Sequence, residues 1–213
     1  ISVGDHNSDG YDDIAVAHLN GNEMYTNIYT NEYSVSSQNK FSLHQELQGA
    51  TYASLDWGDY DNDGDLDLVT SGYTASLTTD QGQEEYINPI TNIYQQNEQG
   101  VFVFDSSLYM IDSVGLSSTQ WGDYDNDGDL DIAIIGQSDD VLNGLQQSYT
   151  RVFANDGEGD FTSVEADIVG LNKGEVIWGD YDGDGDLDLF IGEYYDTDWE
   201  GEVKGVSYFY RNT

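Results

Sequence analysis

The apolar positions of this chain fall into short runs, and the same order of runs recurs four times. Their alternation and their β-branched and aromatic content are typical of β-strands, and no stretch has the spacing of an amphipathic helix. The first predicted strand of each repeat ends in Gly, and in all but the first repeat Trp precedes that Gly. These strands are Ile1–Gly4, Ser54–Gly58, Ser118–Gly122 and Glu175–Gly179.

Three further strands complete the predicted unit. The second is an apolar run at Ile14–Ala17, Leu66–Val69, Ile132–Ile135 and Leu187–Ile191. The third ends in Asn after an aromatic residue, or in a close variant, at Asn27–Asn31, Asn92–Asn97, Arg151–Asn155 and Ser207–Asn212. The fourth carries Phe at Lys40–Phe41, Val101–Phe104 and Asp160–Phe161, and the last repeat has no counterpart. Polar inserts at 74–90 and 137–148 separate second from third strands, and we expect Pro89 in a loop.

Four short strands per repeat predict an all-β fold, a β-propeller of four-stranded blades. A stack of sandwiches is less favoured, because each unit is too small to bury a core alone. We expect one propeller domain or propeller segment over residues 1–213, with units at approximately 1–50, 51–114, 115–171 and 172–213, the last without its final strand. Four units could close imperfectly as a ring, but we prefer part of a seven- or eight-bladed propeller.

A nine-residue acidic loop lies between the first and second strands of each unit. The loops begin at Asp5, Asp59, Asp123 and Asp180, which are 54, 64 and 57 residues apart. Oxygen-bearing side chains occupy loop positions 1, 3, 5 and 9, and Gly occupies position 6. Such a loop is typical of a site for a hard cation such as Ca²⁺, since Gly permits a sharp turn and side-chain oxygens then point inward.

Other acidic motifs fit these loops poorly. An EF-hand needs a bidentate Glu at position 12 and flanking helices, whereas position 12 here is Val16, Thr70, Ile134 or Ile191 within predicted strands. Dockerin-like loops fail for the same reason. Thrombospondin-type repeats need cysteines, and Gly-Gly-x-Gly-x-Asp repeats are absent from the sequence. A solvated acidic turn is the remaining alternative, and the fourfold Gly register argues against it.

The segments Trp-Gly-Asp-Tyr-Asp-x-Asp-Gly-Asp-Leu-Asp, present three times, resemble FG-GAP/VCBS repeats, the calcium-bearing blades of integrin-α-type propellers. The resemblance covers nearly the whole chain. It implies up to four structural Ca²⁺ per chain, held by side chains at positions 1, 3, 5 and 9 and the carbonyl at 7. The first loop departs from the pattern at positions 3 and 7, and we expect weaker binding there. The implied ligand residues are Asp5, Asn7, Asp9, Tyr11, Asp13, Asp59, Asp61, Asp63, Asp65, Asp67, Asp123, Asp125, Asp127, Asp129, Asp131, Asp180, Asp182, Asp184, Asp186 and Asp188.

Charge narrows the choice of partners. The 213 residues carry a formal net charge of −37 with only five Lys and Arg, so nucleic acid is excluded as a partner and an anionic membrane is disfavoured. The sequence contains no Cys and no transmembrane stretch. Calcium loops without a sensor role suit the millimolar calcium outside cells. We therefore expect an extracellular or cell-surface location, and a piece of a longer exported precursor with other domains.

The recurring Trp57, Trp121 and Trp178 are predicted to pack between blades. Trp199, with Tyr194 and Tyr195, has no repeat partner and is a candidate glycan contact, although a rim residue packed on its own loop is the alternative. No Ser-His-Asp arrangement is visible, and we expect no enzyme. The function predicted is binding or adhesion to protein or glycan through loops between blade strands. A lectin-like propeller and a polysaccharide lyase or hydrolase are the alternatives.

Overall fold

The computed structural model describes residues 1–21, 23–34, 41–78, 82, 84–106, 111–140, 145–194 and 205–213. These residues form strands and one short 3₁₀ helix, which confirms the all-β prediction, and none of their helices is long and apolar enough to cross a membrane. The elements are β1 (Ser2–Gly4), β2 (Asp13–Asn20), β3 (Glu23–Asn31), η1 (Glu32–Ser34), β4 (Phe41–Leu47), β5 (Thr51–Gly58), β6 (Asp67–Thr78), β7 (Glu84–Gln96), β8 (Phe102–Phe104), β9 (Gly115–Gly122), β10 (Asp131–Asp140), β11 (Leu145–Asn155), β12 (Phe161–Ser163), β13 (Gly174–Gly179), β14 (Asp188–Tyr194) and β15 (Gly205–Tyr210).

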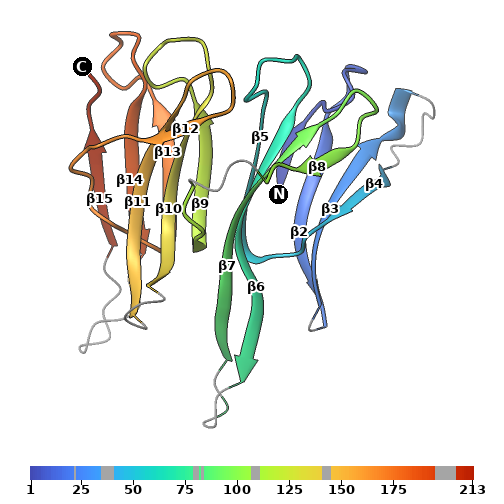
Figure 1. The fold of residues 1–213 in the computed structure, drawn as a ribbon, viewed down its shortest axis with the longest axis horizontal. Coiled ribbons are helices and arrows are strands. Elements are labelled where there is room, and N and C mark those ends of the chain that lie inside the picture. The colour runs from blue at the N-terminus through green and yellow to red at the C-terminus, as the bar shows by residue number, and fades with distance from the viewer. Residues whose placement is uncertain are drawn as a thin grey trace.

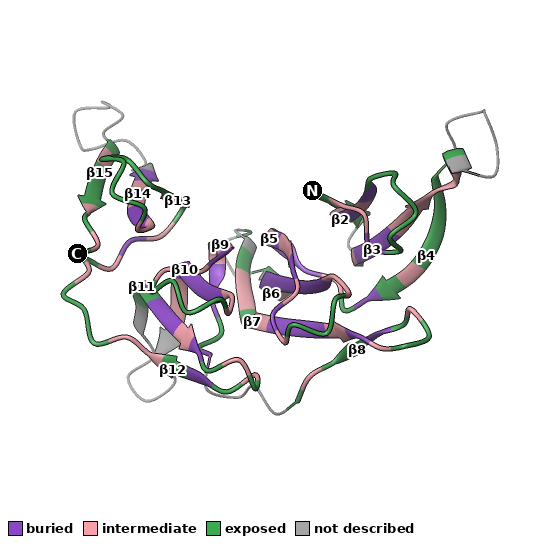
Figure 2. Ribbon diagram, turned by 90° about the horizontal axis from the view of Figure 1, so that it is seen from above, coloured by how far each residue is buried: buried purple, intermediate pink, exposed green. Residues whose placement is uncertain are grey.

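The strands build four antiparallel sheets, each from strands adjacent in sequence. Sheet 1 has the order β1-β2-β3-β4, sheet 2 β5-β6-β7-β8, sheet 3 β9-β10-β11-β12 and sheet 4 β13-β14-β15. The sheets stand side by side (Figure 1) and follow an open arc when seen from above (Figure 2). Over the described residues, three of the sheets have four strands, the last has three, and no sheet is closed. The complete propeller therefore stays a prediction.

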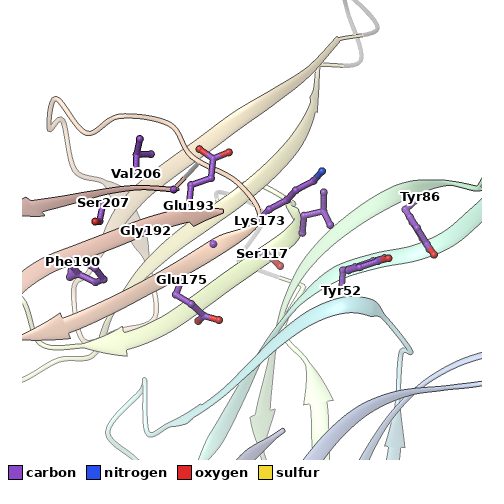
Figure 3. A pocket seen from close by; sticks show the side chains of 13 residues that line it. Tyr52, Tyr86, Ser117, Lys173, Glu175, Phe190, Gly192, Glu193, Val206 and Ser207 are labelled. Atoms are coloured by element: carbon purple, nitrogen blue, oxygen red, sulfur yellow. The ribbon is translucent and has the colours of Figure 1, made fainter. Parts of the chain in front are cut away.

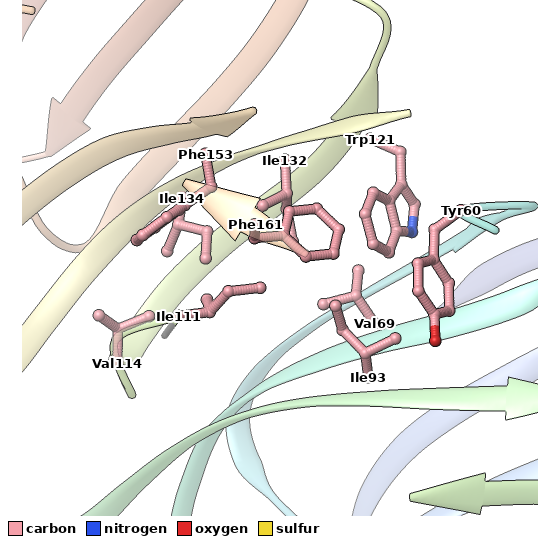
Figure 4. Close-up of a cluster of buried hydrophobic side chains, with 10 residues drawn as sticks. All are labelled: Tyr60, Val69, Ile93, Ile111, Val114, Trp121, Ile132, Ile134, Phe153 and Phe161. Carbon is pink, nitrogen blue, oxygen red and sulfur yellow. The ribbon is translucent and has the colours of Figure 1, made fainter. Parts of the chain in front are cut away.

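The hydrophobic core lies between neighbouring sheets. In β10, Ile132 and Ile134 belong to the cluster shared with sheet 2 (Figure 4), whereas Ala133 and Ile135 belong to the cluster shared with sheet 4. Both faces of this strand are buried, which explains why it reads as one continuous apolar run rather than an alternating one. A third cluster, which includes Ile28 and Leu68, joins sheets 1 and 2 in the same way.

The recurring Trp residues pack between sheets, as the repeat position predicted. Each stacks on the aromatic residue at loop position 2 of the preceding sheet. The ring-centroid distances and interplanar angles are 6.0 Å and 15° for Trp57 on His6, 6.0 Å and 7° for Trp121 on Tyr60, and 6.3 Å and 17° for Trp178 on Tyr124. The Trp residues therefore serve packing between repeats.

The prediction that Pro89 lies in a loop is wrong. It lies within β7 opposite Tyr73, and β6 and β7 stay paired as far as Thr78 and Glu84. The β10–β11 hairpin likewise extends through much of the 137–148 insert. Tyr73, Ala75 and Leu77 alternate with polar residues at the end of β6, and β6 and β7 lengthen into a hairpin. Pro is tolerated there because the adjacent Asn88, with φ of 57°, interrupts the regular ladder.

Candidate metal centres

Each acidic loop is fixed between two strands of its own sheet. The loop follows the Gly that ends the first strand, and its position-9 Asp is the first residue of the second strand. This Asp is buried in all four copies, as Asp13, Asp67, Asp131 and Asp188. The loop ends are therefore anchored by the sheet, while most of the acidic positions between them stay accessible.

The position-9 carboxylate also clamps the loop onto the third strand. In sheet 2, one oxygen of Asp67 accepts from the backbone N–H of Tyr60 at 3.2 Å and the other from that of Gln96 at 2.8 Å. The other three copies repeat both bonds, to His6 and Asn31, to Tyr124 and Asn155, and to Tyr181 and Asn212. The third-strand contact crosses more than twenty residues of sequence in the three later copies and was not predicted.

The position-1 carboxylate closes the turn from inside. Asp59 Oδ2 accepts from the backbone N–H of Gly64 at 3.0 Å, and the other loops make the same bond at 2.8–3.1 Å. The position-6 Gly has a φ of 94° in this loop and 89–98° in all four, a conformation that disfavours side chains. The invariant Gly register thus has the conformational reason expected from the sequence.

Three of the loops gather carboxylates closely enough to hold a metal ion. The groups are Asp59, Asp61 and Asp67; Asp123, Asp125 and Asp127; and Asp180, Asp182 and Asp188, each with ligand atoms within 4.8 Å of one another. In the first group Asp59 Oδ1 is buried without a hydrogen-bond partner. An unsatisfied buried carboxylate oxygen in an all-oxygen donor set is what a hard divalent cation would satisfy, so these residues fit one.

In loops 3 and 4 the side chains at position 7 point to the preceding loop instead. Asp129 Oδ1 accepts from Asn62 Nδ2 at 2.6 Å, and Asp186 Oδ1 accepts from Asn126 Nδ2 at 2.8 Å. These bonds leave the position-7 backbone carbonyl as the expected ligand there. They also join loop 2 to loop 3 and loop 3 to loop 4 along one edge of the arc.

The first loop differs from the others in its residues at positions 3 and 7. Its position-3 Asn7 and position-5 Asp9 accept from loop N–H groups at 3.0 Å each, and the aspartates at the same positions of loop 2 accept in the same way. The ring of Tyr11, at position 7, packs on Tyr33 with centroids 5.1 Å apart. The weaker metal binding expected of this loop stays a prediction.

Burial makes some of these carboxyls hard to ionise without a metal. It raises the pKa of Asp67 to about 8 and that of Asp131 to about 6, because desolvation disfavours the charged form more than the backbone N–H bonds favour it. Desolvation and the neighbouring Asp63 also raise the pKa of Asp61. A bound cation would reverse this preference by stabilising the carboxylates.

Arg211 is a participant that sequence reasoning missed. Its Nε lies 2.6 Å from Asp182 Oδ2 and its Nη2 lies 3.0 Å from Asp184 Oδ2. The Arg211 guanidinium lowers the pKa of the Asp184 carboxyl. The available signal was its place directly before Asn212, the residue that clamps Asp188. The fourth loop therefore carries an internal cation that competes with a metal.

Comparison with known families agrees with the geometry. An FG-GAP-like repeat model matches residues 5–70 and 137–191, more than half of the chain. The chain belongs to the FG-GAP repeat family. No curated protein matches it. FG-GAP repeats often bind calcium, and the family suggests a module for binding or adhesion. Of the predicted glycan contacts, Tyr195 and Trp199 lie outside the described residues, and of Tyr194 only the backbone, at the end of β14, is described.

Proposed function

We propose that this FG-GAP repeat chain is an extracellular, calcium-stabilised module that binds protein or glycan without catalysis. The observation that carries the calcium part is the buried, unpartnered Asp59 Oδ1 within a group of carboxylates. Ca²⁺ would satisfy this oxygen and offset the repulsion among the carboxylates, so binding would stabilise the folded state. Up to four Ca²⁺ per chain follow from the four loops, and the arc of sheets supports a segment of a seven- or eight-bladed propeller.

Thermal unfolding with titrated Ca²⁺ and with EGTA, alongside metal quantification, tests this part. We expect three or four bound Ca²⁺ and a large loss of melting temperature in EGTA. Asp59→Asn combined with Asp61→Asn should remove one bound ion, whereas Asp167→Asn, an exposed residue outside the loops, should remove none. A chain that binds no metal and unfolds at the same temperature in EGTA would refute it.

A hollow at the opposite edge of the sheets supports the binding part. Tyr52, Leu116 and Lys173 lie where β5, β9 and β13 begin, far from the loops that follow those strands, and line a hollow of about 1080 Å³ (Figure 3). All three have left-handed backbones, with φ of 48°, 49° and 52°. Such backbones are uncommon for bulky residues. Bulges and strained backbone commonly re-aim side chains at binding sites.

The side chains of this hollow favour a saccharide as the ligand. The Tyr52 and Tyr86 rings meet edge to face with centroids 4.7 Å apart, and Glu175 and Glu193 line the same hollow. Aromatic faces stack on sugar rings, carboxylates accept hydroxyl hydrogen bonds, and Lys173 supplies a cation for an acidic sugar. Tyr86 belongs to the 74–90 insert, which is the kind of variable segment that carries function.

A glycan array with matched variants separates the candidates. We expect the wild type to bind a saccharide and Tyr52→Ala to lose that binding, while Tyr33→Ala, in η1, retains it. Capture of a surface protein without glycan binding would favour adhesion to a protein over the lectin-like alternative. Turnover of an acidic polysaccharide would favour the lyase or hydrolase alternative.

A further inference from the structure

Each contact between neighbouring sheets joins an acceptor face to a donor face. The acceptor face presents the Gly before the loop and the aromatic residue after it, and the donor face presents the Trp and the amide that ends the third strand. Between sheets 2 and 3, Trp121 stacks on Tyr60, and a Cβ on Gly58 would lie 2.7 Å from Trp121 Cδ1. Asn155 Nδ2 donates to the Tyr60 carbonyl at 2.6 Å.

The same contacts recur at the other two junctions. Asn212 Nδ2 donates to the Tyr124 carbonyl, and Gln96 Nε2 donates to the His6 carbonyl. Gly122 faces Trp178, and Gly4 faces Trp57. The repeat therefore specifies a fixed register in which one sheet docks on the next.

Sheet 4 exposes a complete acceptor face. A Cβ on Gly179 would meet nothing within 4 Å among the described residues, and Tyr181 is 60% exposed where its equivalent Tyr60 is 2% exposed. Phe209 is 64% exposed. Its equivalents by strand register, Ile28, Ile93 and Val152, are buried in the three junctions.

Sheet 1 exposes the matching donor face. Val3, at the Trp position, is 57% exposed, and Phe41 is 46% exposed where its register equivalent Phe102 is 3% exposed. Asn31 Nδ2 donates to the Asp12 carbonyl within its own sheet, as Asn155 Nδ2 donates to that of Leu130. Its second amide hydrogen is the one that in Asn155 reaches the preceding sheet.

The two exposed faces compensate each other in size. Sheet 4 carries Phe190 and Phe209 where the other acceptor faces carry smaller side chains, namely Ala15 with Ile28, Val69 with Ile93 and Ala133 with Val152. Sheet 1 carries Val3 where the other donor faces carry Trp. A Trp-bearing sheet would overpack against two Phe rings, whereas Val3 leaves room for them.

The acidic loops at the two exposed faces also differ from the other loops in a matched way. Asn at position 4 bonds to Asp at position 7 of the next loop between loops 2 and 3 and between loops 3 and 4. Loop 4 has Gly183 at position 4, and loop 1 has Tyr11 at position 7. Both members of the polar pair are therefore missing at these two faces, and neither is left with a mismatched partner.

We propose that the sheet-4 face of one copy docks on the sheet-1 face of a second copy. The two faces lie at opposite ends of the open arc (Figure 2), so two copies arranged head to tail cover all four faces and form a dimeric ring. This inference is independent of the ligand proposal, since Tyr52, Tyr86 and Lys173 lie outside these faces. Phe190 alone among the residues argued here also lines the hollow.

Sedimentation equilibrium of the whole chain in Ca²⁺ tests the proposal. We expect a species of twice the 23.7 kDa chain mass, converted to monomer by Phe209→Asp or by Val3→Asp. Val103→Asp, at a similarly exposed Val on β8, should leave the dimer intact. A wild type that stays monomeric throughout a concentration series would overturn the proposal, as would a dimer that survives both face variants.

Mixing the two face variants gives a test that misfolding cannot imitate. The Phe209→Asp chain retains an intact sheet-1 face, and the Val3→Asp chain retains an intact sheet-4 face. We expect the mixture to form a heterodimer through one intact contact, although each variant alone is monomeric. Two variants with native circular dichroism spectra whose mixture stays monomeric would overturn the head-to-tail register.

Discussion

The Trp121 ring stacks on the Tyr60 ring with centroids 6.0 Å apart and planes 7° apart, although the two residues belong to different sheets. Tyr60 is buried, and its hydroxyl donates to Asp105 Oδ2 at 2.8 Å. Truncation therefore removes an aromatic contact, a hydrogen bond and buried volume at once. We expect Tyr60→Ala to lower the free energy of unfolding by roughly 3–5 kcal/mol in urea titrations.

Tyr181→Ala is the matched control, because Tyr181 occupies the same loop position but is exposed. At concentrations where the chain is monomeric, its cost should stay within about 0.5 kcal/mol. Equal losses for the two variants would mean that stacking between sheets contributes little to stability.

Most of the strands could be predicted from the local sequence, because alternation and the Gly register are properties of adjacent residues. The packing role of Trp57, Trp121 and Trp178 could also be predicted, since a side chain repeated at one place in the three later units has one structural role. The number of units in a complete ring could not be predicted, because it depends on the angle between packed sheets. The β6–β7 hairpin was hidden by Pro89, a residue that normally signals a loop.

The candidate metal centres show the same division. Positions 1, 3 and 5 could be proposed as ligands from the loop pattern, and position 9 from the resemblance to FG-GAP/VCBS repeats. The second use of Asp67, as an acceptor for the Gln96 N–H, depends on the pairing of β6 with β7. The contact of Arg211 with Asp182 likewise depends on where the residues that follow β15 pass loop 4. Such contacts join residues distant in sequence, and strand register rather than composition determines them.

The clamp made by Asp67 should stabilise sheet 2 even without metal. Asp67→Ala leaves the buried N–H groups of Tyr60 and Gln96 without their acceptor, at a cost of roughly 1–3 kcal/mol for each group. We expect a lower free energy of unfolding in EGTA, measured by urea titration. Asp65→Ala, two residues away, should have a much smaller effect under the same conditions. A comparable loss for Asp65→Ala would argue that loop charge rather than the clamp is responsible.

Arg211 should weaken metal binding at the fourth loop. It occupies Asp182 Oδ2 and Asp184 Oδ2, so a divalent cation must compete with it. We expect Arg211→Gln to bind Ca²⁺ a few-fold more tightly at this loop and to be less stable in EGTA, because the carboxylates lose their internal cation. Calorimetric titration resolves the first effect and thermal unfolding the second. Arg151→Gln, on β11, is the charge-matched control and should leave calcium affinity unchanged.

The buried carboxyls predict an unusual pH dependence for the metal-free protein. The pKa of Asp67 is raised to about 8 and that of Asp131 to about 6, both above the unfolded value near 3.8. Between these values the folded state binds more protons than the unfolded state, so the free energy of unfolding falls as pH rises from about 4 to about 8. Calcium binding must release these protons. The stabilisation by Ca²⁺ should therefore grow over the same range.

His6 changes the free energy of unfolding with pH in the opposite direction to Asp67. The effect of Asp67 can therefore be observed alone only above the pH range in which His6 titrates. Burial lowers the pKa of His6 below its ordinary 6.5, so its contribution to stability is lost as pH falls from about 6.5 through this lowered pKa. Above about pH 6.5 His6 is neutral in both states. Urea titrations in EGTA between about pH 6.5 and 8 should then show stability falling with pH for the wild type and a flatter profile for Asp67→Asn, which has no carboxyl to titrate. Identical slopes would assign the pH dependence to other groups.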